Sequence, residues 1–386
     1  PEFRHPVAGP SDCVCITVGV TAHRDLRFVD EATLRQRVRD FFLGLREQFP
    51  DLPTRVLCSL AAGGDILVAE VARELDIALI VPLPMALEEY EKDFTDPSDL
   101  ARLRGLLEGA EITELPLVEG NTLERIAVDA DARALQYAQM GAFISSHSQI
   151  LMALWDGEFT DAVGGTGSVV FFHQRDYMPG YLEPEATSQL LADNENDLIY
   201  HIMVPRSEAD TGTAPLSVVW LGQQGQQRSD ALPREYHAVF ENLQTFLRDC
   251  VKNHAMLQDA LGEAQRRHSE PQPRELQTIE QLFVYADGLA IQYRRRVVLG
   301  FRTTHTMAAL MGLSFILYSE FESLFYLLHT FLALFVIAYL LDRVMGARHW
   351  HRKYLDYRAL AEGLRVQYYW IMGGVDKARG TVFAYD

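Results

Sequence analysis

Two long uncharged stretches in the last third of this 386-residue chain constrain its fold more than any other feature. Residues 324–341 carry no formal charge, and an α-helix of this length spans about 27 Å, close to the hydrocarbon core of a bilayer. Residues 303–318 form a second, shorter apolar stretch, and only residues 319–323 join the two. The sequence therefore predicts a transmembrane helical hairpin over residues 303–341. A buried hairpin in a soluble helical bundle is the alternative.

Basic residues flank the predicted hairpin, whereas its connection carries two carboxylates. The flanking residues are Arg294, Arg295, Arg296 and Arg302 before it, and Arg343, Arg348, Arg352 and Lys353 after it. An excess of Lys and Arg marks the cytoplasmic side of membrane helices. We therefore expect two spans, with both ends of the hairpin in the cytoplasm.

The first half of the chain alternates short apolar runs with helical patterns, which is typical of a parallel sheet covered by helices. Residues 12–178 therefore predict an α/β fold, a Rossmann-like doubly wound parallel sheet. Pro82 is expected to end the third strand. The helix at 31–48 is expected to bury the stripe Leu34, Val38, Phe41, Phe42 and Leu45. The expected strands are residues 14–20, 55–60, 77–81, 112–117 and 150–155, and the helices are residues 31–48, 64–75 and 123–146.

Three further segments complete the predicted organisation. Residues 179–232 form a connecting insertion, whose strand-like runs at 198–204 and 216–221 would make a β-hairpin on the sheet edge. Residues 233–302 predict cytoplasmic helices, with one helix over 234–267 that carries a heptad seam. This seam fits an amphipathic helix in a bundle or a self-associating coiled coil. Residues 342–386 predict a cytoplasmic C-terminal helix.

The charge of the chain indicates which classes of partner it can bind. The chain carries 35 Lys and Arg against 53 Asp and Glu, a net charge of −18, which disfavours nucleic-acid polymers. Residues 290–386 are nonetheless basic, which favours an anionic or membrane partner for that part. The four cysteines have no zinc-binding spacing, so we assign no metal ligand.

Three glycine-containing turns follow strands of the predicted sheet, at residues 19–25, 59–65 and 155–167. The carboxyl ends of parallel strands meet at one edge, where backbone N–H groups at helix N-termini bind anions. His23 and Arg24 add donors that suit an anionic or purine group. The predicted ligand-binding residues are Gly19, Thr21, His23, Arg24, Ser59, Gly63, Gly64, Asp65, Trp155, Asp156, Gly157, Gly164, Gly165 and Thr166.

These motifs resemble a known family. The turn at 19–25 is similar to the GxTGHR opening of one branch of the SLOG (SMF/DprA-LOG) superfamily, with Ala22 in place of a glycine, and residues 60–65 resemble its LAxGxD turn. Tyr137, Gly141 and the run at 151–167 follow its third signature. The hairpin, with residues 357–365, resembles the SLATT family of two-span membrane effectors.

The resemblance implies a sensor and membrane effector of a bacterial antiphage system, located in the inner membrane. Its ligand would be a nucleotide second messenger, either a cyclic nucleotide or an ADP-ribose derivative, with no other cofactor. Binding would drive homo-oligomerisation, followed by pore formation or membrane disruption.

Some SLOG relatives are phosphoribohydrolases, so a membrane-anchored nucleotide or NAD hydrolase is the alternative. Those enzymes use a PGGxGTxxE motif. Here Val163 replaces its proline, and no carboxylate occurs at Ser168, Val169 or Val170. This difference favours binding without hydrolysis, and we assign no catalytic residue.

Overall fold

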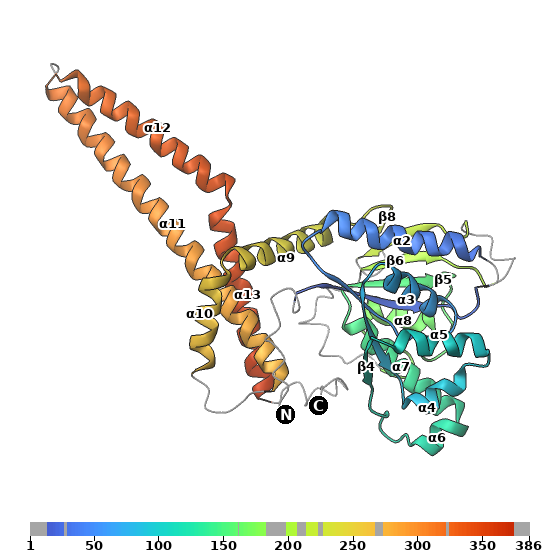
Figure 1. Cartoon of the computed structure of the whole chain (residues 1–386). Coiled ribbons are helices and arrows are strands. Elements are labelled where there is room, and N and C mark those ends of the chain that lie inside the picture. The colour runs from blue at the N-terminus through green and yellow to red at the C-terminus, as the bar shows by residue number, and fades with distance from the viewer. Residues whose placement is uncertain are drawn as a thin grey trace. The chain divides into compact units, whose positions relative to one another are not determined.

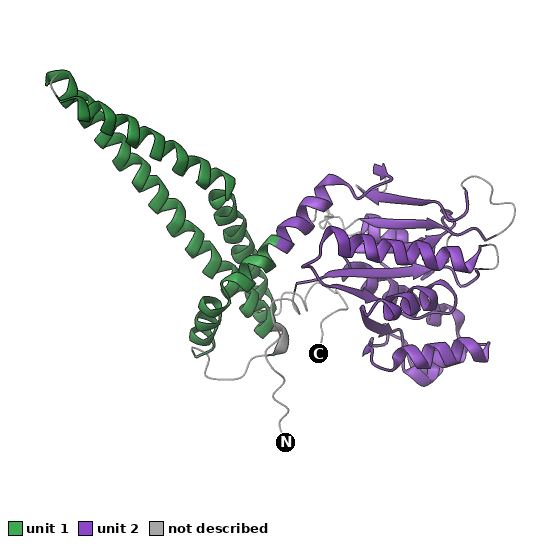
Figure 2. Ribbon diagram, turned by 45° about the horizontal axis from the view of Figure 1, so that its top comes forward, with its two compact units in different colours: residues 1–13, 245–386 green, residues 14–244 purple. Residues whose placement is uncertain are grey.

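The structure, a computed structural model, describes residues 14–26, 29–160, 162–182, 198–206, 214–222, 227–266, 273–321 and 324–373 (Figure 1). These residues belong to two compact units, which Figure 2 shows in different colours. The first, Val14–Gln244, is the α/β unit. The second begins at Thr245 and is the helical unit.

Within the described residues, the α/β unit contains one eight-stranded sheet with the order β4-β3-β2-β1-β5-β6-β7-β8. Neighbouring strands from β4 to β6 are parallel, and β7 and β8 are added antiparallel. The mostly parallel α/β sheet predicted from the sequence is therefore confirmed. The strands are β1 (Ile16–Ala22), β2 (Thr54–Leu57), β3 (Ala78–Leu83), β4 (Glu111–Glu114), β5 (Ile150–Trp155), β6 (Ile199–Met203), β7 (Val218–Gly222) and β8 (Gln227–Ser229).

The strand order reverses between β1 and β5. From β1 the chain adds β2, β3 and β4 in one direction, whereas β5 pairs with the other side of β1 and β6 lies beyond it. The two strands stay aligned to their ends, because Ala22 pairs with Leu154 and the N–H of His23 donates to Leu154 O at 3.0 Å. Open parallel sheets bind ligands at such a reversal, outside the carboxyl ends of the strands.

Helices cover both faces of this sheet. Right-handed crossovers place α2, α3 and α5 on one face and α7 and α8 on the other, and the pairs α2–α3, α3–α5 and α7–α8 are in contact. In α2 the five residues of the predicted stripe are the buried ones, so that prediction is confirmed. The helices are α2 (Glu31–Gln48), α3 (Gly64–Glu74), α4 (Leu87–Tyr90), η1 (Glu91–Asp93), α5 (Pro97–Leu107), α6 (Leu123–Val128), α7 (Ala130–Ser146) and α8 (Thr166–Arg175).

Residues 123–146 do not form the single helix predicted from the sequence, because α6 and α7 are separated at Asp129. Asp129 has an extended backbone, with φ −106° and ψ 109°. Its carboxylate accepts hydrogen bonds from the N–H groups of Asp131 at 3.0 Å and Ala132 at 3.2 Å. A residue that caps a helix in this way lies outside it, so a new helix begins at Ala130.

The third strand also departs from the prediction, since β3 continues through Pro82 to Leu83. Its pairing with β2 ends at Ile80, whose carbonyl accepts from Cys58 N, while the carbonyl of Leu83 accepts from Leu115 N on the β4 side. Backbone groups alternate between the two sides of a strand, so Pro82 faces the side where β2 has already ended. Its missing N–H therefore removes no hydrogen bond from the ladder.

The two strands expected within residues 179–232 are β6 and β7. They pair antiparallel, with Tyr200 opposite Trp220, and β6 pairs parallel with β5. Phe41 of α2 packs against both rings, at centroid distances of 4.4 Å from Tyr200 and 5.9 Å from Trp220. This segment therefore contributes strands to the same sheet and to the same core.

The stretch predicted as one helix over residues 234–267 is divided into α9 (Arg234–Lys252) and α10 (His254–Gln265). The break is at Asn253, with φ −111° and ψ 22°. Its side chain donates to Asp249 O at 2.7 Å and accepts from Gln292 Nε2 at 2.8 Å. These hydrogen bonds stabilise a backbone conformation that interrupts the helix. The seam residues Leu257 and Leu261 of α10 are buried, and α10 packs on α11 (Arg274–Glu320) of the same chain.

A buried carboxylate connects three helices of the helical unit. Asp249 of α9 accepts hydrogen bonds at Oδ2 from Tyr357 OH at 2.6 Å, Lys353 Nζ at 2.7 Å and Tyr293 OH at 2.9 Å. Tyr293 belongs to α11 (Arg274–Glu320), and the other two donors belong to α13 (Trp350–Met372). Because removal of one partner from a buried charged pair is costly, this cluster holds α9, α11 and α13 together.

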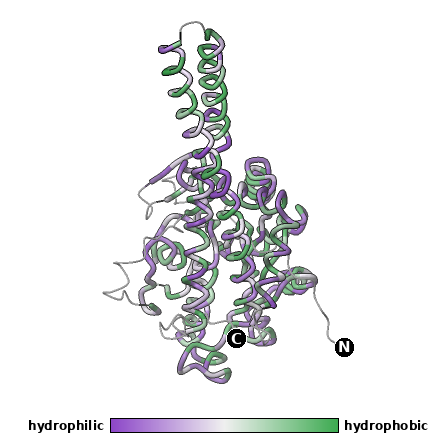
Figure 3. Tube along the Cα trace, turned by 90° about the vertical axis from the view of Figure 1, so that its left-hand side faces the viewer, coloured by the Kyte–Doolittle hydropathy of each residue, from purple (hydrophilic) through white to green (hydrophobic). Residues whose placement is uncertain are grey.

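The longer apolar stretch, residues 324–341, lies almost entirely in α12 (Phe325–Ala347), which runs antiparallel to the end of α11. The rings of Phe315 and Phe331 are 5.9 Å apart near the turn, and Gly300 lies against Met345 at the other end. Large apolar side chains on both helices remain exposed, and Figure 3 shows hydrophobic residues predominating near this turn. Among the described residues, one helical stretch, Phe325–Met372, is long and apolar enough to cross a membrane, judged by length and composition alone.

Two helical glycines of the α/β unit offer a matched test of its packing. A Cβ at Gly141 of α7 would lie 2.3 Å from Val169 Cγ2 of α8, whereas a Cβ at Gly44 of α2 would meet nothing within 4 Å. Gly141→Ala is therefore expected to destabilise the α/β unit by about 1–3 kcal/mol. Gly44→Ala is expected to stabilise it by about 0.5–1 kcal/mol. Calorimetric unfolding of the full chain measures both, and equal shifts would contradict the close α7–α8 contact.

Candidate functional site

A cavity of about 450 Å³ lies in the α/β unit at the carboxyl ends of β1 and β5. Residues from the β1–α2, β2–α3 and β5–α8 connections line it, together with one side of α7. The turns thus meet at the strand reversal, as the sequence predicted. Eight of the fourteen predicted residues line this cavity: Thr21, His23, Arg24, Ser59, Asp65, Gly164, Gly165 and Thr166.

Gly63 and Gly64 do not line the cavity but allow two of its loops to touch. Gly63 has φ +90°, and a Cβ there would lie 2.2 Å from the carbonyl oxygen of Arg24. A Cβ at Gly64 would lie 2.4 Å from Ala22 Cβ, and the N–H of Gly64 donates to His23 O at 3.1 Å. The glycines of the second turn therefore serve close packing against the first turn.

Gly19, Trp155 and Gly157 also lie outside the cavity lining. A Cβ at Gly19 would lie 2.6 Å from Ser148 Oγ, so this glycine lets β1 approach the end of α7. Trp155 is buried and donates from Nε1 to Glu158 O at 3.2 Å, while Gly157 turns the chain with φ +86°. These residues shape the loop after β5.

The third turn leads into α8, which begins beside the end of β1. Gly164 has φ +74°, and a Cβ there would lie 2.7 Å from Ala138 N of α7. Thr166 Oγ1 donates to Ala22 O at 3.0 Å, which fixes the turn to β1. Gly165, the residue before α8, supplies no capping side chain. Among the described residues no side chain caps the first-turn N–H groups of α8, and such groups form anion sites at helix N-termini.

Asp156 does not line the cavity but holds His23 in place. The N–H of Asp156 is 3.1 Å from His23 Nε2, and its Oδ1 is 3.3 Å from the same nitrogen. Both side chains are buried. Burial and the nearby Arg206 guanidinium lower the pKa of His23, and these effects outweigh the opposing effect of Asp156. His23 is therefore a neutral hydrogen-bonding residue near pH 7.

Arg24 brings a positive charge into the cavity. Its side chain is exposed, and the guanidinium lies 5.4 Å from the centroid of the Tyr137 ring. Tyr137 is fixed in turn by a hydrogen bond from its hydroxyl to Asp93. Burial, followed by the contact with Asp93, raises the pKa of Tyr137, so the ring stays neutral. A cation stacked on an aromatic ring suits an anionic, flat ligand.

Asp65 is a buried carboxyl group in the wall of the cavity. Its Oδ2 accepts from Ser59 Oγ at 2.7 Å, whereas its Oδ1 has no hydrogen-bond partner among the described residues. Burial raises the pKa of Asp65 to about 7, against the lowering effects of Ser59, the nearby Ala61 backbone and Arg24. An orphaned polar atom inside a concave site is typical of positions that bind a ligand or act in proton transfer.

Arg206 and Tyr137 line the cavity, although neither was among the predicted ligand-binding residues. Tyr137 had a signal, since it lies on the predicted long helix and in the third family signature. No sequence motif indicated that Arg206 would reach the cavity. It follows β6, and only the parallel pairing of β6 with β5 brings it to this edge of the sheet.

Comparisons with protein-family models, with curated proteins and with solved structures find no match for this chain. In the part of the chain that the structure describes, no group of three or more His, Cys, Asp or Glu side chains could hold a metal ion. The residues that line the cavity suit a nucleotide-like ligand, with two arginines, an aromatic ring and a glycine turn before a helix.

The pKa of Asp65 predicts a pH dependence of stability. Because its folded-state pKa of about 7 exceeds the ordinary aspartate value of 3.8, the folded state binds the proton more tightly than the unfolded state. The contribution of Asp65 to the free energy of unfolding is therefore greatest below about pH 4 and is lost as pH rises through about 7, by roughly 2–3 kcal/mol between about pH 5 and 8. Asp65→Asn should remove this dependence. Hydrogen exchange of the α3 amides, corrected for intrinsic rates, measures this pH dependence of stability. The control is Asp131→Asn, because Asp131 is exposed.

Proposed function

We propose that the α/β unit is a nucleotide sensor and that the chain is a ligand-gated membrane effector. The main support for a sensor is the cavity at the point where the strand order of the parallel sheet reverses. Its volume of about 450 Å³ lies within the usual range for small-molecule sites. The chemistry of its lining favours a nucleotide second messenger, either a cyclic nucleotide or an ADP-ribose derivative, as the SLOG resemblance implies.

The lining after the third glycine turn favours binding without hydrolysis. Val169 lines the cavity there, and Ser168 donates its hydroxyl to Ala162 O at 2.6 Å. This part of the wall offers no acid or base to a bound sugar. Thr166 is engaged with Ala22 O, so it supports the turn and has no free hydroxyl proton for chemistry.

Asp65 gives the hydrolase alternative its specific support. A carboxyl group with a pKa of about 7 in a cavity wall is suited to general acid–base catalysis. Asp156 is less suited, because its oxygens contact His23, Arg206 and the N–H of Glu158. A membrane-anchored nucleotide or NAD hydrolase would therefore use Asp65, and its product would be a free base.

For the helical unit we propose two membrane spans, formed by the end of α11 and by α12. The support is the exposure of apolar side chains on both helices, including Leu313 and Phe315 on α11 and Leu332 and Phe335 on α12. Exposed arginines, among them Arg295, Arg302 and Arg343, lie in the helix segments away from the turn. Both ends would be cytoplasmic at a bacterial inner membrane. Ligand-driven homo-oligomerisation would then open a pore or disrupt the bilayer of an infected cell.

Arg24 provides the test of the sensor. Titration calorimetry of the full chain with cyclic AMP, ADP-ribose, NAD and adenosine should give binding to at least one phosphate-bearing compound. Arg24→Ala should weaken that binding about tenfold or more, because a charge-assisted contact is lost. Arg39→Ala is the control, since Arg39 of α2 pairs with Glu74 of α3 and neither residue lines the cavity. Absence of binding to the whole panel would reject the sensor, and free base in the same mixtures would favour the hydrolase.

Leu332 provides the test of the membrane spans. Leu332 of α12 and Leu355 of α13 have nearly equal exposed fractions, 51% and 50%. An arginine at the centre of a membrane helix costs about 2.5–3.5 kcal/mol, so Leu332→Arg should lower the fraction of chain that floats with liposomes. Leu355→Arg lies outside the proposed spans and should not. Equal flotation of the two variants would indicate that α12 does not enter the bilayer.

A further inference from the structure

The chain directly after β6 brings one side chain to the cavity. Strand β6 pairs parallel with β5, with Met203 opposite Trp155, so both strands end at the same edge of the sheet. The chain is held just beyond that point, because the N–H of Val204 donates to Trp155 O at 3.0 Å and Pro205 is buried. Arg206 follows directly and lines the cavity.

Two buried side chains hold Arg206 at this position. Its Nε lies 3.2 Å from Asp156 Oδ2, and its Nη2 lies 3.3 Å from His23 Nδ1. The side chains of His23 and Asp156 are 4% and 5% exposed, whereas that of Arg206 is 49% exposed. The Arg206 guanidinium is therefore held by Asp156 and His23, while about half of the side chain is exposed.

The contact between Arg206 and His23 is a replaceable one. A neutral imidazole has one N–H, so it accepts at one nitrogen only. If Nε2 accepts from the N–H of Asp156, then Nδ1 carries the proton and faces a donor of Arg206. If Nδ1 accepts from Arg206, then Nε2 donates to Asp156 Oδ1 and no longer accepts from the Asp156 N–H. No neutral tautomer satisfies all three contacts, so the hydrogen bond from Arg206 to His23 can be exchanged for one to a ligand oxygen while Nε2 of His23 accepts from the N–H of Asp156.

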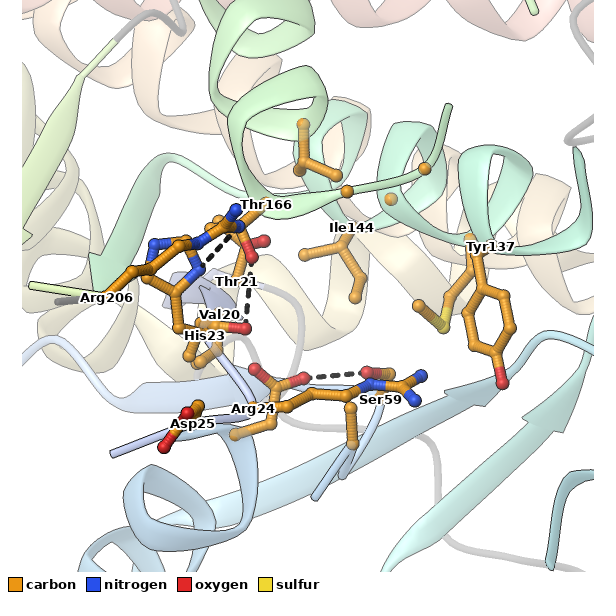
Figure 4. A pocket seen from close by; sticks show the side chains of 18 residues that line it. Val20, Thr21, His23, Arg24, Asp25, Ser59, Tyr137, Ile144, Thr166 and Arg206 are labelled. Carbon is orange, nitrogen blue, oxygen red and sulfur yellow. Dashed lines mark hydrogen bonds between the residues drawn. The ribbon is translucent and has the colours of Figure 1, made fainter. Parts of the chain in front are cut away.

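The surroundings of Arg206 favour an anion as that ligand. Figure 4 shows Arg206 next to Thr166, the first residue of α8, while Arg24 and Tyr137 lie toward the other end of the cavity. No side chain of the described residues caps the first turn of α8, and its N–H groups favour negative charge. A guanidinium beside a helix N-terminus matches the geometry of a phosphate group.

We propose that Arg206 is a specificity-determining residue that binds a phosphate of the nucleotide, together with the N-terminus of α8. Arg206, directly after the described strand β6, thereby completes the binding site and restricts it to phosphorylated ligands. This inference rests on the proposed nucleotide-binding function. On ligand binding, Arg206 keeps its contact with Asp156 and exchanges His23 for a phosphate oxygen, and His23 then accepts from the N–H of Asp156.

The test compares a phosphorylated probe with its nucleoside in the full chain. Adenosine, AMP, cyclic AMP and ADP-ribose are titrated calorimetrically, and the phosphate-bearing compound that binds the wild-type chain best is the probe. Arg206→Ala should weaken binding of this probe about tenfold to hundredfold and leave adenosine binding unchanged. Arg206→Lys should lie between, because it keeps the charge but loses the planar fork. Arg104→Ala, which removes an exposed arginine paired with one carboxylate, is the matched control.

Each other outcome has a distinct meaning. Wild-type and Arg206→Ala chains that bind the probe equally would overturn the role of Arg206 and leave the sensor intact. Equal weakening of probe and adenosine would also overturn it, because Arg206 would then act on the shape of the cavity. A wild-type chain that binds none of the four compounds would overturn the proposed function and this inference together.

Discussion

The parallel pairing of β1 with β5 is the constraint on which the rest of the α/β unit depends. These strands are separated by more than a hundred residues, and their register from Val18–Ile150 to Ala22–Leu154 is unbroken. It brings the loop after β1 against the loop after β5, where Thr166 bonds to Ala22 and His23 contacts Asp156. The reversal of strand order at this pair leaves a space that no crossover helix fills, because crossovers on its two sides leave toward opposite faces of the sheet. The candidate site is that space.

Several polar side chains that line the cavity are held in place by other polar side chains around it. Asp156 fixes His23 and Arg206, and Asp93 fixes Tyr137, which lies under the guanidinium of Arg24. Asp65, with its neighbour Ser59, is buried where the second turn is pressed against the first. Several carboxylates here therefore orient other side chains that line the cavity. Two exposed arginines, Arg24 and Arg206, thus line one cavity of a chain whose net charge is −18.

Much of the fold follows from local patterns in the sequence. The buried stripe of α2, the parallel strands and the hairpin strands β6 and β7 are each visible as spacing of apolar residues, because burial on one face imposes that spacing. Helix boundaries were less predictable. Asp129 and Asn253 interrupt helices through side-chain hydrogen bonds, and such residues are tolerated in a helical pattern as easily as they break it. Pro82 stays within a strand for a non-local reason, since the end of the neighbouring β2 decides whether its missing N–H matters.

The candidate site divides in the same way. By itself the sequence determined that glycine turns follow three strands and that His23, Arg24 and Asp65 lie in those turns, because motif chemistry is local. It also determined the long apolar stretches and their basic flanks, since both depend only on composition along the chain. Only the tertiary structure decided that Gly63 and Gly64 serve loop packing, that Asp156 holds other side chains, and that Arg206 reaches the cavity. These roles depend on strand register and on contacts between residues far apart in the chain, which no local pattern records.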